Sequence, residues 1–324
     1  MNQENGQKLD VKDKKILYEL DLNAHQTFSQ IAKKVRLHKD TVAYRMKQLE
    51  KAGIISGYTT ILSYPKVGLS IFKMYFQFQG MTKIQEEEIL NYFVKHEGTG
   101  WIAACNGSWD LIVGFGVKDS TEFNKIKTEI MIKYSRFITN IAVTELIEAF
   151  IYPRNYLLNT ENHKETRLID DAKKEEVNPI DKKILLELTK NSRNTVVEIA
   201  QKLKTTARIV QYRIKHLEKN NTIKLYKLTL NLEKTSYQYY KCFITLHNLT
   251  KQREASLLEY CKQNPNIIHN VISLGAWDLE PEFEVKNAEE FYQIIKEMRN
   301  KFSDIIKSIE TVVIQRELKF NYLP

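Results

Sequence analysis

The sequence predicts an α+β protein built from two tandem copies of one unit. The first observation is an internal repeat, since residues 13–20 (DKKILYEL) return as residues 181–188 (DKKILLEL), 168 positions later. Residues 44–45, 49–51 and 107–111 recur at the same offset. A period this long indicates two tandem domains rather than a solenoid. The second observation is that each copy begins with apolar residues at helical spacing and continues with the alternation that is typical of strands.

The start of each copy predicts three helices and a short β segment. In the first copy, residues 13–22, 28–35 and 37–53 carry apolar residues three or four positions apart, which predicts helices. Residues 54–62 predict a small hairpin. Three helices followed by a β wing describe a winged helix-turn-helix.

The third of these helices is the candidate for reading DNA. Val42, Met46 and Leu49 form one narrow apolar stripe, the opposite face is polar and basic, and Gly53 suits the end of the helix. A helix laid in a major groove needs such an outer face. The alternative is an ordinary amphipathic surface helix, but the copy at residues 205–221 and the flanking helices favour groove binding.

Arginines in the middle of the two helices are expected to hold phosphates, and the lysines and Arg208 to add charge that releases counterions. The remaining polar side chains are candidates for base edges or sugars. For each, the alternative is a plain solvated side chain. The candidate DNA contacts are Lys39, Thr41, Tyr44, Arg45, Lys47, Gln48, Arg208, Gln211, Tyr212, Arg213 and Lys215.

The charge distribution supports this interpretation. The chain has a net charge of +9, with 11 Lys and Arg against 7 Asp and Glu in residues 1–60, and 12 against 4 in residues 178–228. The rest of the chain is therefore slightly negative. Two short basic segments fit local binding to a polyanion better than a generally basic surface does.

The second part of each copy predicts the order β-α-β-β-α-β, which is the ferredoxin-like arrangement. In the first copy a strand from residue 71, read as half-buried, precedes a helix at 82–96, strands at 100–105 and 110–117, a helix at 120–134 and a strand at 138–152. The second copy predicts strands at 239–246, 267–274, 279–285 and 306–320, with helices at 251–263 and 288–302. The expected domains are 1–62, 63–157, 178–230 and 231–324, with an exposed, partly helical linker at 158–177.

These motifs and their spacing resemble the Lrp/AsnC family of transcription regulators. The matching residues are Leu9-Asp10, Ile31-Ala32, Thr41-Val42, Arg45, Leu49-Glu50, Gly53, Gly57-Tyr58, Gly107 and Asp110-Leu111. The resemblance implies a winged helix-turn-helix joined to a ferredoxin-like effector domain, dimerisation through the sheets, further homo-oligomerisation and, in many members, an amino-acid effector. For this chain it implies double-stranded DNA as the partner and pairing of the two copies as an intrachain pseudo-dimer.

The same resemblance suggests effector contacts after the second sheet strand. For the tryptophans there, packing in a core or interface is the more frequent role. The aspartates are more often found ordering a hairpin. The candidate effector residues are Gly107, Trp109, Asp110, Gly275, Trp277 and Asp278.

Some residues depart from the family pattern. Arg36 and Lys204 stand where the family usually has Gly in the turn before the recognition helix. A left-handed residue there would cost roughly 1 kcal/mol, so a reshaped turn is expected. His38 replaces the usual Ser cap, and Asp40 is expected to supply the cap instead.

The strand predicted at residues 279–285, the third of the second effector domain, departs most. Pro281 favours an edge strand or a bulge. Three alternating glutamates, Glu280, Glu282 and Glu284, make this strand acidic where the first copy is apolar or Gly. The two effector halves are therefore not expected to bind the same ligand equally.

Other classes of protein find little support in the sequence. The three cysteines form no Cys-x-x-Cys pair, no metal or phosphate-binding motif is present, and no cofactor is expected. No apolar run reaches membrane-spanning length, so a reducing, cytoplasmic compartment and no membrane partner are expected. The enzymatic alternative is a sirohaem decarboxylase on the same fused fold, although such an enzyme would have little reason to keep two basic recognition faces. The third alternative is a ligand-sensing module without DNA binding.

Overall fold

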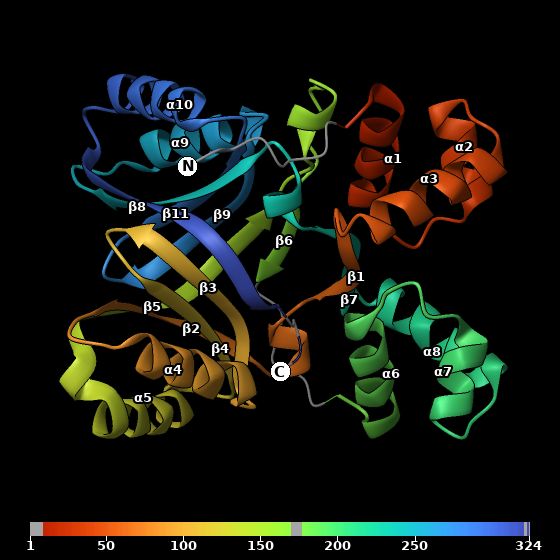
Figure 1. The fold of residues 1–324 in the computed structure, drawn as a ribbon, viewed down its shortest axis with the longest axis horizontal. Helices are drawn as coiled ribbons and strands as arrows, with labels where there is room; N and C mark the ends of the chain where they lie inside the picture. The colour runs from red at the N-terminus through yellow and green to blue at the C-terminus, as the bar shows by residue number, and fades with distance from the viewer. Residues whose placement is uncertain (1–8, 170–176, 321–322, 324) are drawn as a thin grey trace.

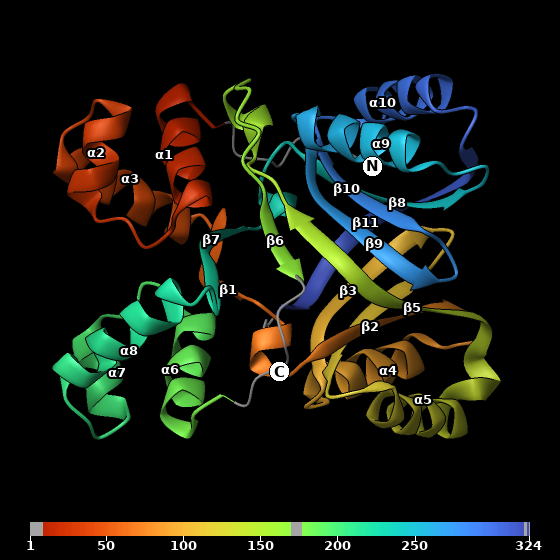
Figure 2. The ribbon, with the colours of Figure 1, turned by 180° about the vertical axis from the view of Figure 1, so that it is seen from behind.

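The computed structural model describes residues 9–169, 177–320 and 323. Two helical heads lie at one side of the molecule, and a curved β structure with helices on its outer faces lies at the other (Figure 1). The view from behind shows the same division (Figure 2). The predicted α+β class, with two winged helix-turn-helix units and two ferredoxin-like domains, is confirmed. Residues that lie 168 positions apart are called matching residues below.

The helices and strands follow the predicted order in both copies. The first copy consists of α1 (Val11–Leu22), α2 (Phe28–Val35), α3 (Lys39–Lys51), β1 (Ile55–Leu62), β2 (Ser70–Phe78), α4 (Lys83–Lys95), β3 (Thr99–Gly107), β4 (Leu111–Val117), α5 (Ser120–Tyr134), β5 (Ile138–Ile151) and β6 (Thr166–Ile169). The second consists of α6 (Pro179–Lys190), α7 (Val196–Lys202), α8 (Ala207–Lys219), β7 (Ile223–Leu230), β8 (Gln238–Leu246), α9 (Lys251–Gln263), β9 (Ile267–Gly275), β10 (Leu279–Val285), α10 (Ala288–Lys301) and β11 (Ile306–Phe320).

The prediction of a hairpin at residues 54–62 is wrong. This segment forms the single strand β1, which pairs antiparallel with β7 of the second copy. Residues 58–62 contain no Gly, Asn, Asp or Pro that would favour a turn, so the segment stays extended. Ala24 N donates to Tyr226 O at 2.8 Å, and Ser192 N donates to Tyr58 O at 2.9 Å, so each head binds the strand of the other copy. The two heads therefore share one sheet and one hydrophobic core.

The effector sheets of the two copies join into one structure. The strand order is β2-β4-β3-β11-β8-β10-β9-β5-β6, and an additional pairing of β2 with β5 closes eight of these strands into a ring, called the barrel below. The first half of β5 pairs with β2 and its second half pairs with β9 of the other copy. In the same way β11 pairs first with β8 and then with β3. This exchange realises the predicted intrachain pseudo-dimer.

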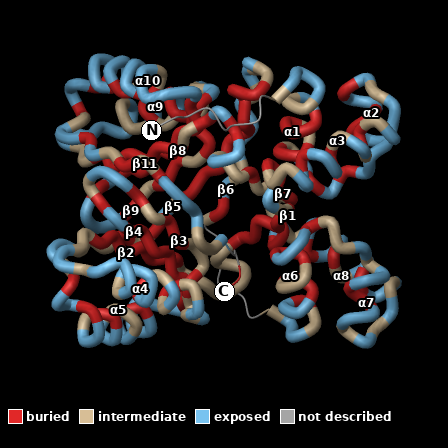
Figure 3. Tube along the Cα trace, viewed as in Figure 1, coloured by how far each residue is buried: buried red, intermediate tan, exposed pale blue. Residues whose placement is uncertain are grey.

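Closure of the barrel buries many residues of its strands (Figure 3). Helices α4 and α5 cover one outer face of the barrel through a cluster that includes Phe93 and Phe123. Helices α9 and α10 cover the other through a cluster that includes Leu257 and Phe291. The expectation that the strand from residue 71 is half-buried is wrong, because residues 71–76 of β2 are all buried, one face under the helices and the other inside the barrel.

Two further expectations differ from the structure. The stretch expected to be an exposed, partly helical linker contains β6, which extends the sheet beside β5 and buries Leu168. The part of that linker at 170–176 lies outside the described residues. Strand β10 lies between β8 and β9, so the edge expected at Pro281 is wrong, although a register irregularity follows Glu282. None of the helices in the described part of the chain is long and apolar enough to cross a bilayer.

Candidate nucleic-acid interface and effector sites

The two recognition helices are anchored by their apolar stripes. Val42, Met46 and Leu49 of α3 are buried, and so are the corresponding residues of α8, Val210, Ile214 and Leu217. His38 caps α3 itself, because its Nδ1 accepts a long hydrogen bond of 3.5 Å from Asp40 N, so the expected cap from Asp40 is wrong. Because the apolar stripes of α3 and α8 face the core, the opposite face of each helix faces solvent.

The turn before each recognition helix keeps its left-handed residue. Arg36 has φ 56° and ψ 49°, and Lys204 has φ 52°. The expected reshaping of the turn is therefore wrong. Each copy instead accepts a left-handed residue with a side chain, at a cost of roughly 1 kcal/mol.

Most of the candidate DNA contacts lie on the solvent face. Tyr44 and Tyr212 are 63% and 67% exposed, which is unusual for such large rings. Thr41, Arg45 and Arg213 are half-buried. The other exposed candidates are Lys39, Lys47, Gln48, Arg208, Gln211 and Lys215.

The two central arginines fasten each recognition helix to the first helix of its head. Arg45 Nη1 lies 2.8 Å from carboxylate oxygens of both Asp10 and Asp13, which raise its pKa above the ordinary value. Arg213 Nη1 lies 3.6 Å from Asp181. Asn178 stands at the position that matches Asp10, so Arg213 has one carboxylate where Arg45 has two. Their expected phosphate contacts stay predictions.

The outward surfaces of α3 and α8 are alike in part. The tyrosines match one another, and so do Lys47 and Lys215. Several other outward positions differ, with Lys39 matched by Ala207, Asp40 by Arg208, Thr41 by Ile209, Ala43 by Gln211 and Gln48 by His216. The second head thus presents a cation where the first presents an anion.

The six candidate effector residues lie where the two copies meet. Trp109 and Trp277 are buried with ring centroids 5.9 Å apart. Asp110 accepts a hydrogen bond from Phe78 N at 2.8 Å, and Asp278 accepts one from Leu246 N at 2.7 Å, so both order their hairpins.

The two glycines among these candidates have a packing role. Gly107 has φ 130°, and a Cβ there would lie 2.6 Å from Thr311 O of the crossing strand. The matching Gly275 has φ 138°, and a Cβ there would lie 2.4 Å from Val143 O. The candidate effector residues therefore have structural roles in the hairpin turns and at the points where strands of the two copies cross. Their contact with an effector stays a prediction.

Sequence reasoning missed a buried ionic network inside the barrel. Glu280 lies 3.0 Å from Lys73 Nζ and 2.7 Å from Lys241 Nζ, and Ser273 donates to it at 2.5 Å. Burial lowers the pKa of Lys73 to about 8, although Glu280 opposes this. Burial alone would raise the pKa of Glu280, but Lys241 and Lys73 outweigh it and hold the pKa well below the ordinary value. The lysines match one another, so a matched pair of lysines in otherwise apolar strands was the available signal.

The second glutamate of β10 is surrounded by donors. Glu282 lies 2.6 Å from Lys241 Nζ, accepts from Tyr239 Oη at 2.5 Å and lies 2.8 Å from His269 Nδ1. Burial would raise its pKa, but Lys241 and His269 hold it well below the ordinary value. Glu282 is therefore an ionised group that accepts from three surrounding side chains.

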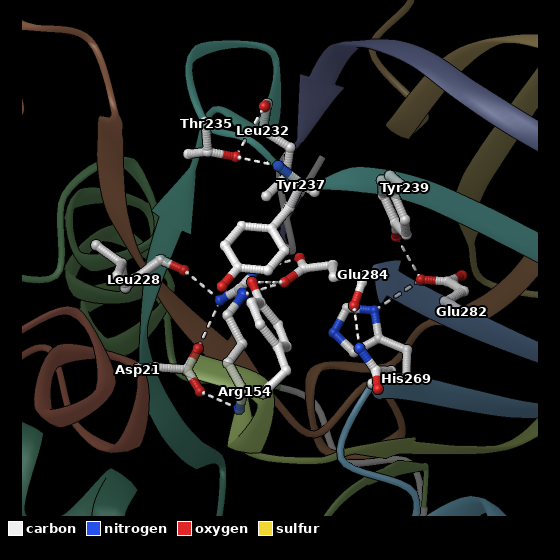
Figure 4. A network of polar contacts seen from close by, with 12 residues as sticks. Asp21, Arg154, Leu228, Leu232, Thr235, Tyr237, Tyr239, His269, Glu282 and Glu284 are labelled. Carbon is white, nitrogen blue, oxygen red and sulfur yellow. Dashed lines mark hydrogen bonds and ion pairs between the residues drawn. The ribbon is translucent and has the colours of Figure 1, made fainter. Parts of the chain in front are cut away.

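A third buried glutamate connects the barrel to the first head (Figure 4). Arg154 Nε lies 2.8 Å from Glu284, and Arg154 Nη1 lies 2.5 Å from Asp21 of α1. Lys227 of β7 lies 2.9 Å from the same Asp21, and Tyr156 donates to Glu284. The acidic strand predicted from the sequence thus supplies three of the four carboxylates in two buried ionic groups, and Asp21 of α1 supplies the fourth.

Paired winged helix-turn-helix units with exposed, basic recognition faces define a DNA-binding protein. The family profile for winged helix-turn-helix DNA-binding matches residues 9–56 and 177–224. An uncharacterized HTH-type transcriptional regulator of Pyrococcus abyssi is 30% identical over 118 residues, which cover 36% of this chain and 78% of the relative. The HTH-type transcriptional regulator LrpA of Pyrococcus horikoshii is 41% identical over 63 residues, which cover 19% of this chain and 45% of LrpA. The chain belongs to the Lrp/AsnC family of transcriptional regulators.

One solved structure is similar along nearly the whole chain. The siroheme decarboxylase NirDL matches 96% of this chain and 93% of its own, with a TM-score of 0.62 and 12% sequence identity. At this identity the likeness concerns the fold alone.

Proposed function

We propose that this regulator binds double-stranded DNA with α3 and α8 together, as two unlike halves of one reading surface. The observation that carries the proposal is the shared β1–β7 sheet, which holds the two heads in a fixed relation. Because the outward residues of α3 and α8 differ, the preferred site is an imperfect palindrome. Half-site spacing follows from the fixed relation of the heads.

The proposed role of each outward side chain follows from its exposure and from the residue at the matching position. The tyrosines at 44 and 212 and the lysines at 47 and 215 reach common features of the two half-sites, because they match. Arg208 and Gln211 distinguish the second half-site, since Asp40 and Ala43 stand at their positions in the first. Binding weakens steeply with salt, because the lysines and arginines displace counterions from the phosphates.

Selection of bound sites from random duplexes tests this proposal. The wild-type chain is expected to select two related but unequal half-sites. The matched variant carries Ala207→Lys, Arg208→Asp, Ile209→Thr, Gln211→Ala and His216→Gln, which give α8 the differing outward residues of α3, and it is expected to select a more symmetric site. A perfect palindrome selected by the wild type would contradict the proposal, and undetectable duplex affinity at low salt would remove it.

We further propose that the barrel receives a small-molecule effector, as the family resemblance implies, and that the chains assemble beyond the pseudo-dimer. Thermal stabilisation by a panel of amino acids tests the effector class that the resemblance suggests. Light scattering at several concentrations measures the assembly. A strictly monomeric chain would contradict the second part without touching the first.

A second candidate function is an enzyme of the siroheme decarboxylase type, and the similarity to NirDL over 96% of this chain is the observation in its favour. Two features of the barrel weigh against it. Glu280, Glu282 and Glu284 are buried in the interior, and the cavity beside them measures about 100 Å³, which is small for a tetrapyrrole, while a space of about 750 Å³ lies outside it along β8 and β11. Absorbance in the Soret region of the purified protein, alone and with added sirohaem, distinguishes this enzyme from the regulator.

A further inference from the structure

The interior of the barrel is asymmetric. A cavity of about 100 Å³ is lined by three glycines of the first copy, Gly100, Gly114 and Gly116. The matching positions of the second copy carry Ile268, Glu282 and Glu284. Small residues therefore open one side of the barrel, where larger side chains occupy the other.

The opposite side is correspondingly closed. The cavity there measures about 40 Å³, and Ile268, Glu284 and Arg154 are among its lining residues. Arg154 and Glu284 form a buried ion pair that takes up this space. A homodimer would carry two equal sites, but in the fused chain the cavity at the three glycines is larger than the cavity at Ile268 and Glu284.

The open cavity contains a cation with spare hydrogen-bonding capacity. Lys73 is 6% exposed and lines the cavity. An ammonium group has three donors, and among the described residues one carboxylate, that of Glu280, lies within ion-pair distance of this one, at 3.0 Å. His269 also lines the cavity, and its Nδ1 faces Glu282, which leaves Nε2 for a ligand.

The anionic groups of the network already have cationic partners. Glu282 is held by Lys241, Tyr239 and His269, and Glu280 is held by the two lysines and a serine hydroxyl. A cationic ligand would meet Lys73 without an available counter-charge. An anionic ligand would add a second acceptor to a desolvated ammonium group, which is favourable in a low-dielectric interior.

The rest of the cavity wall is apolar and in part aromatic. It includes Ile71, Trp101, Leu146, Phe150, Val271 and Phe320. An engineered apolar cavity of about 150 Å³ accommodates benzene. The space here is smaller, about 100 Å³, but it is not enclosed, so it suits an apolar ring that enters it in part.

We propose that this cavity is a single binding site for a small hydrophobic monocarboxylate, with its carboxylate on Lys73 and its apolar body among the aromatic and aliphatic side chains. The role of such a ligand as an effector rests on the proposed function as a regulator. Its binding to the barrel does not depend on DNA.

Titration calorimetry of the full chain without DNA tests the site, with phenylacetate as the probe. Phenylacetamide and 2-phenylethylamine present the same ring with a neutral or a cationic group. Phenylacetate is expected to bind with one equivalent per chain, and the amide and the amine at least about tenfold more weakly, since one charge-assisted hydrogen bond contributes roughly that factor.

Two variants locate the binding in the cavity. Lys73→Met is expected to weaken phenylacetate binding at least about tenfold while the chain folds, because Glu280 keeps Lys241 at 2.7 Å and Ser273 at 2.5 Å. Gly100→Ile introduces the residue found at the matching position and is expected to abolish binding by filling the space. Ile268→Val, on the closed side, is the control and is expected to leave the affinity unchanged.

Several results would overturn the proposal: two equivalents per chain, equal binding of the amide, retained binding by Gly100→Ile, or no binding of phenylacetate at all. Duplex affinity of the same preparations is measured separately. If the duplex binds and phenylacetate does not, this inference fails and the proposed DNA-binding function stands. If phenylacetate binds as expected and no duplex does, the site stands and the regulator function fails.

Discussion

The first head is attached to its surroundings by buried charges, and the second by hydroxyl groups. Asp21 of α1 is fully buried between Arg154 and Lys227. The position that matches Asp21 holds Thr189, whose carbonyl accepts from Thr59 Oγ1 at 3.0 Å, and Thr59 in turn matches Lys227. The backbones of the two heads correspond, but the chemistry of their attachment does not.

This difference teaches what fusion of the two copies permits. In a homodimer every substitution appears twice, so a glutamate near the two-fold axis would face its own copy. In the fused chain Glu280 is present once and lies between the matching lysines Lys73 and Lys241, while Ile112 occupies the corresponding position in the first copy. One carboxylate can therefore form ion pairs with two lysines, and the two halves can differ in function.

The largest expected effect breaks the attachment of the first head. Asp21→Asn leaves Arg154 and Lys227 buried without this anion, and removal of one partner from a buried ion pair typically costs about 3–5 kcal/mol. The comparison change Thr59→Val is expected to cost about 1 kcal/mol, since it removes the neutral hydrogen bond from Thr59 Oγ1 to Thr189 O. Urea unfolding of both variants measures the difference, and equal losses would show that the two attachments are energetically alike.

Acid is expected to weaken the same attachment. Burial would raise the pKa of Asp21, but Lys227 and Arg154 outweigh it and hold the pKa below its ordinary value. A carboxyl with a lowered pKa stabilises the fold above its unfolded pKa, near 4, and this contribution is lost as the pH falls through the folded pKa. Wild-type stability should therefore fall more steeply below about pH 4 than that of Asp21→Asn. Thermal unfolding between pH 2 and 6 compares them, and parallel curves would contradict the assignment.

A smaller effect separates the two central arginines. Because Arg45 has two carboxylate partners and Arg213 has one at 3.6 Å, Arg213 is the more available to phosphate. Arg213→Ala is expected to reduce the slope of log affinity against log salt by about one unit. Arg45→Ala is expected to change the slope less and to lower stability by up to about 1 kcal/mol. Fluorescence anisotropy on one duplex at several salt concentrations measures both slopes, and the reverse order would contradict this comparison.

The smallest effect is expected to be equal in the two copies. Arg36→Gly and Lys204→Gly relieve left-handed residues with nearly the same φ, 56° and 52°. Each is expected to stabilise its head by at most about 1 kcal/mol. Relief of the left-handed strain stabilises the fold, but the added glycine raises the entropy of the unfolded chain and offsets part of the gain. Unfolding midpoints of the single and double variants test whether the gains are equal and additive. A gain in one copy alone would show that the two turns differ in ways that their backbones do not reveal.

The sequence was sufficient for most of the elements, β6 and the single strand β1 excepted, and for the position of the two recognition helices. The stripe of Val42, Met46 and Leu49 is a local pattern, and the helix it predicts lies at residues 39–51. The order of the ferredoxin-like elements followed in the same way, because each depends on the spacing of nearby apolar residues. The repeat itself indicated that the two copies are built alike.

The pairing of strands between the two copies could not be predicted from local sequence patterns. No local feature of β1 indicates which strand it pairs with. A hairpin was therefore predicted where β1 pairs with β7 of the other copy. The side of a strand that faces a barrel interior is also decided by closure, and for this reason Lys73 was placed on a half-exposed strand rather than inside.

The sequence by itself determined two copies, their helices and most of their strands, and the basic faces of α3 and α8, because these follow from periodicity and charge along a short stretch of chain. Only the tertiary structure decided that the acidic strand β10 faces inward, that Asp21 is joined to Arg154, and that glycines leave one side of the barrel open. Those features depend on residues more than a hundred positions apart, which meet through strand exchange between the copies.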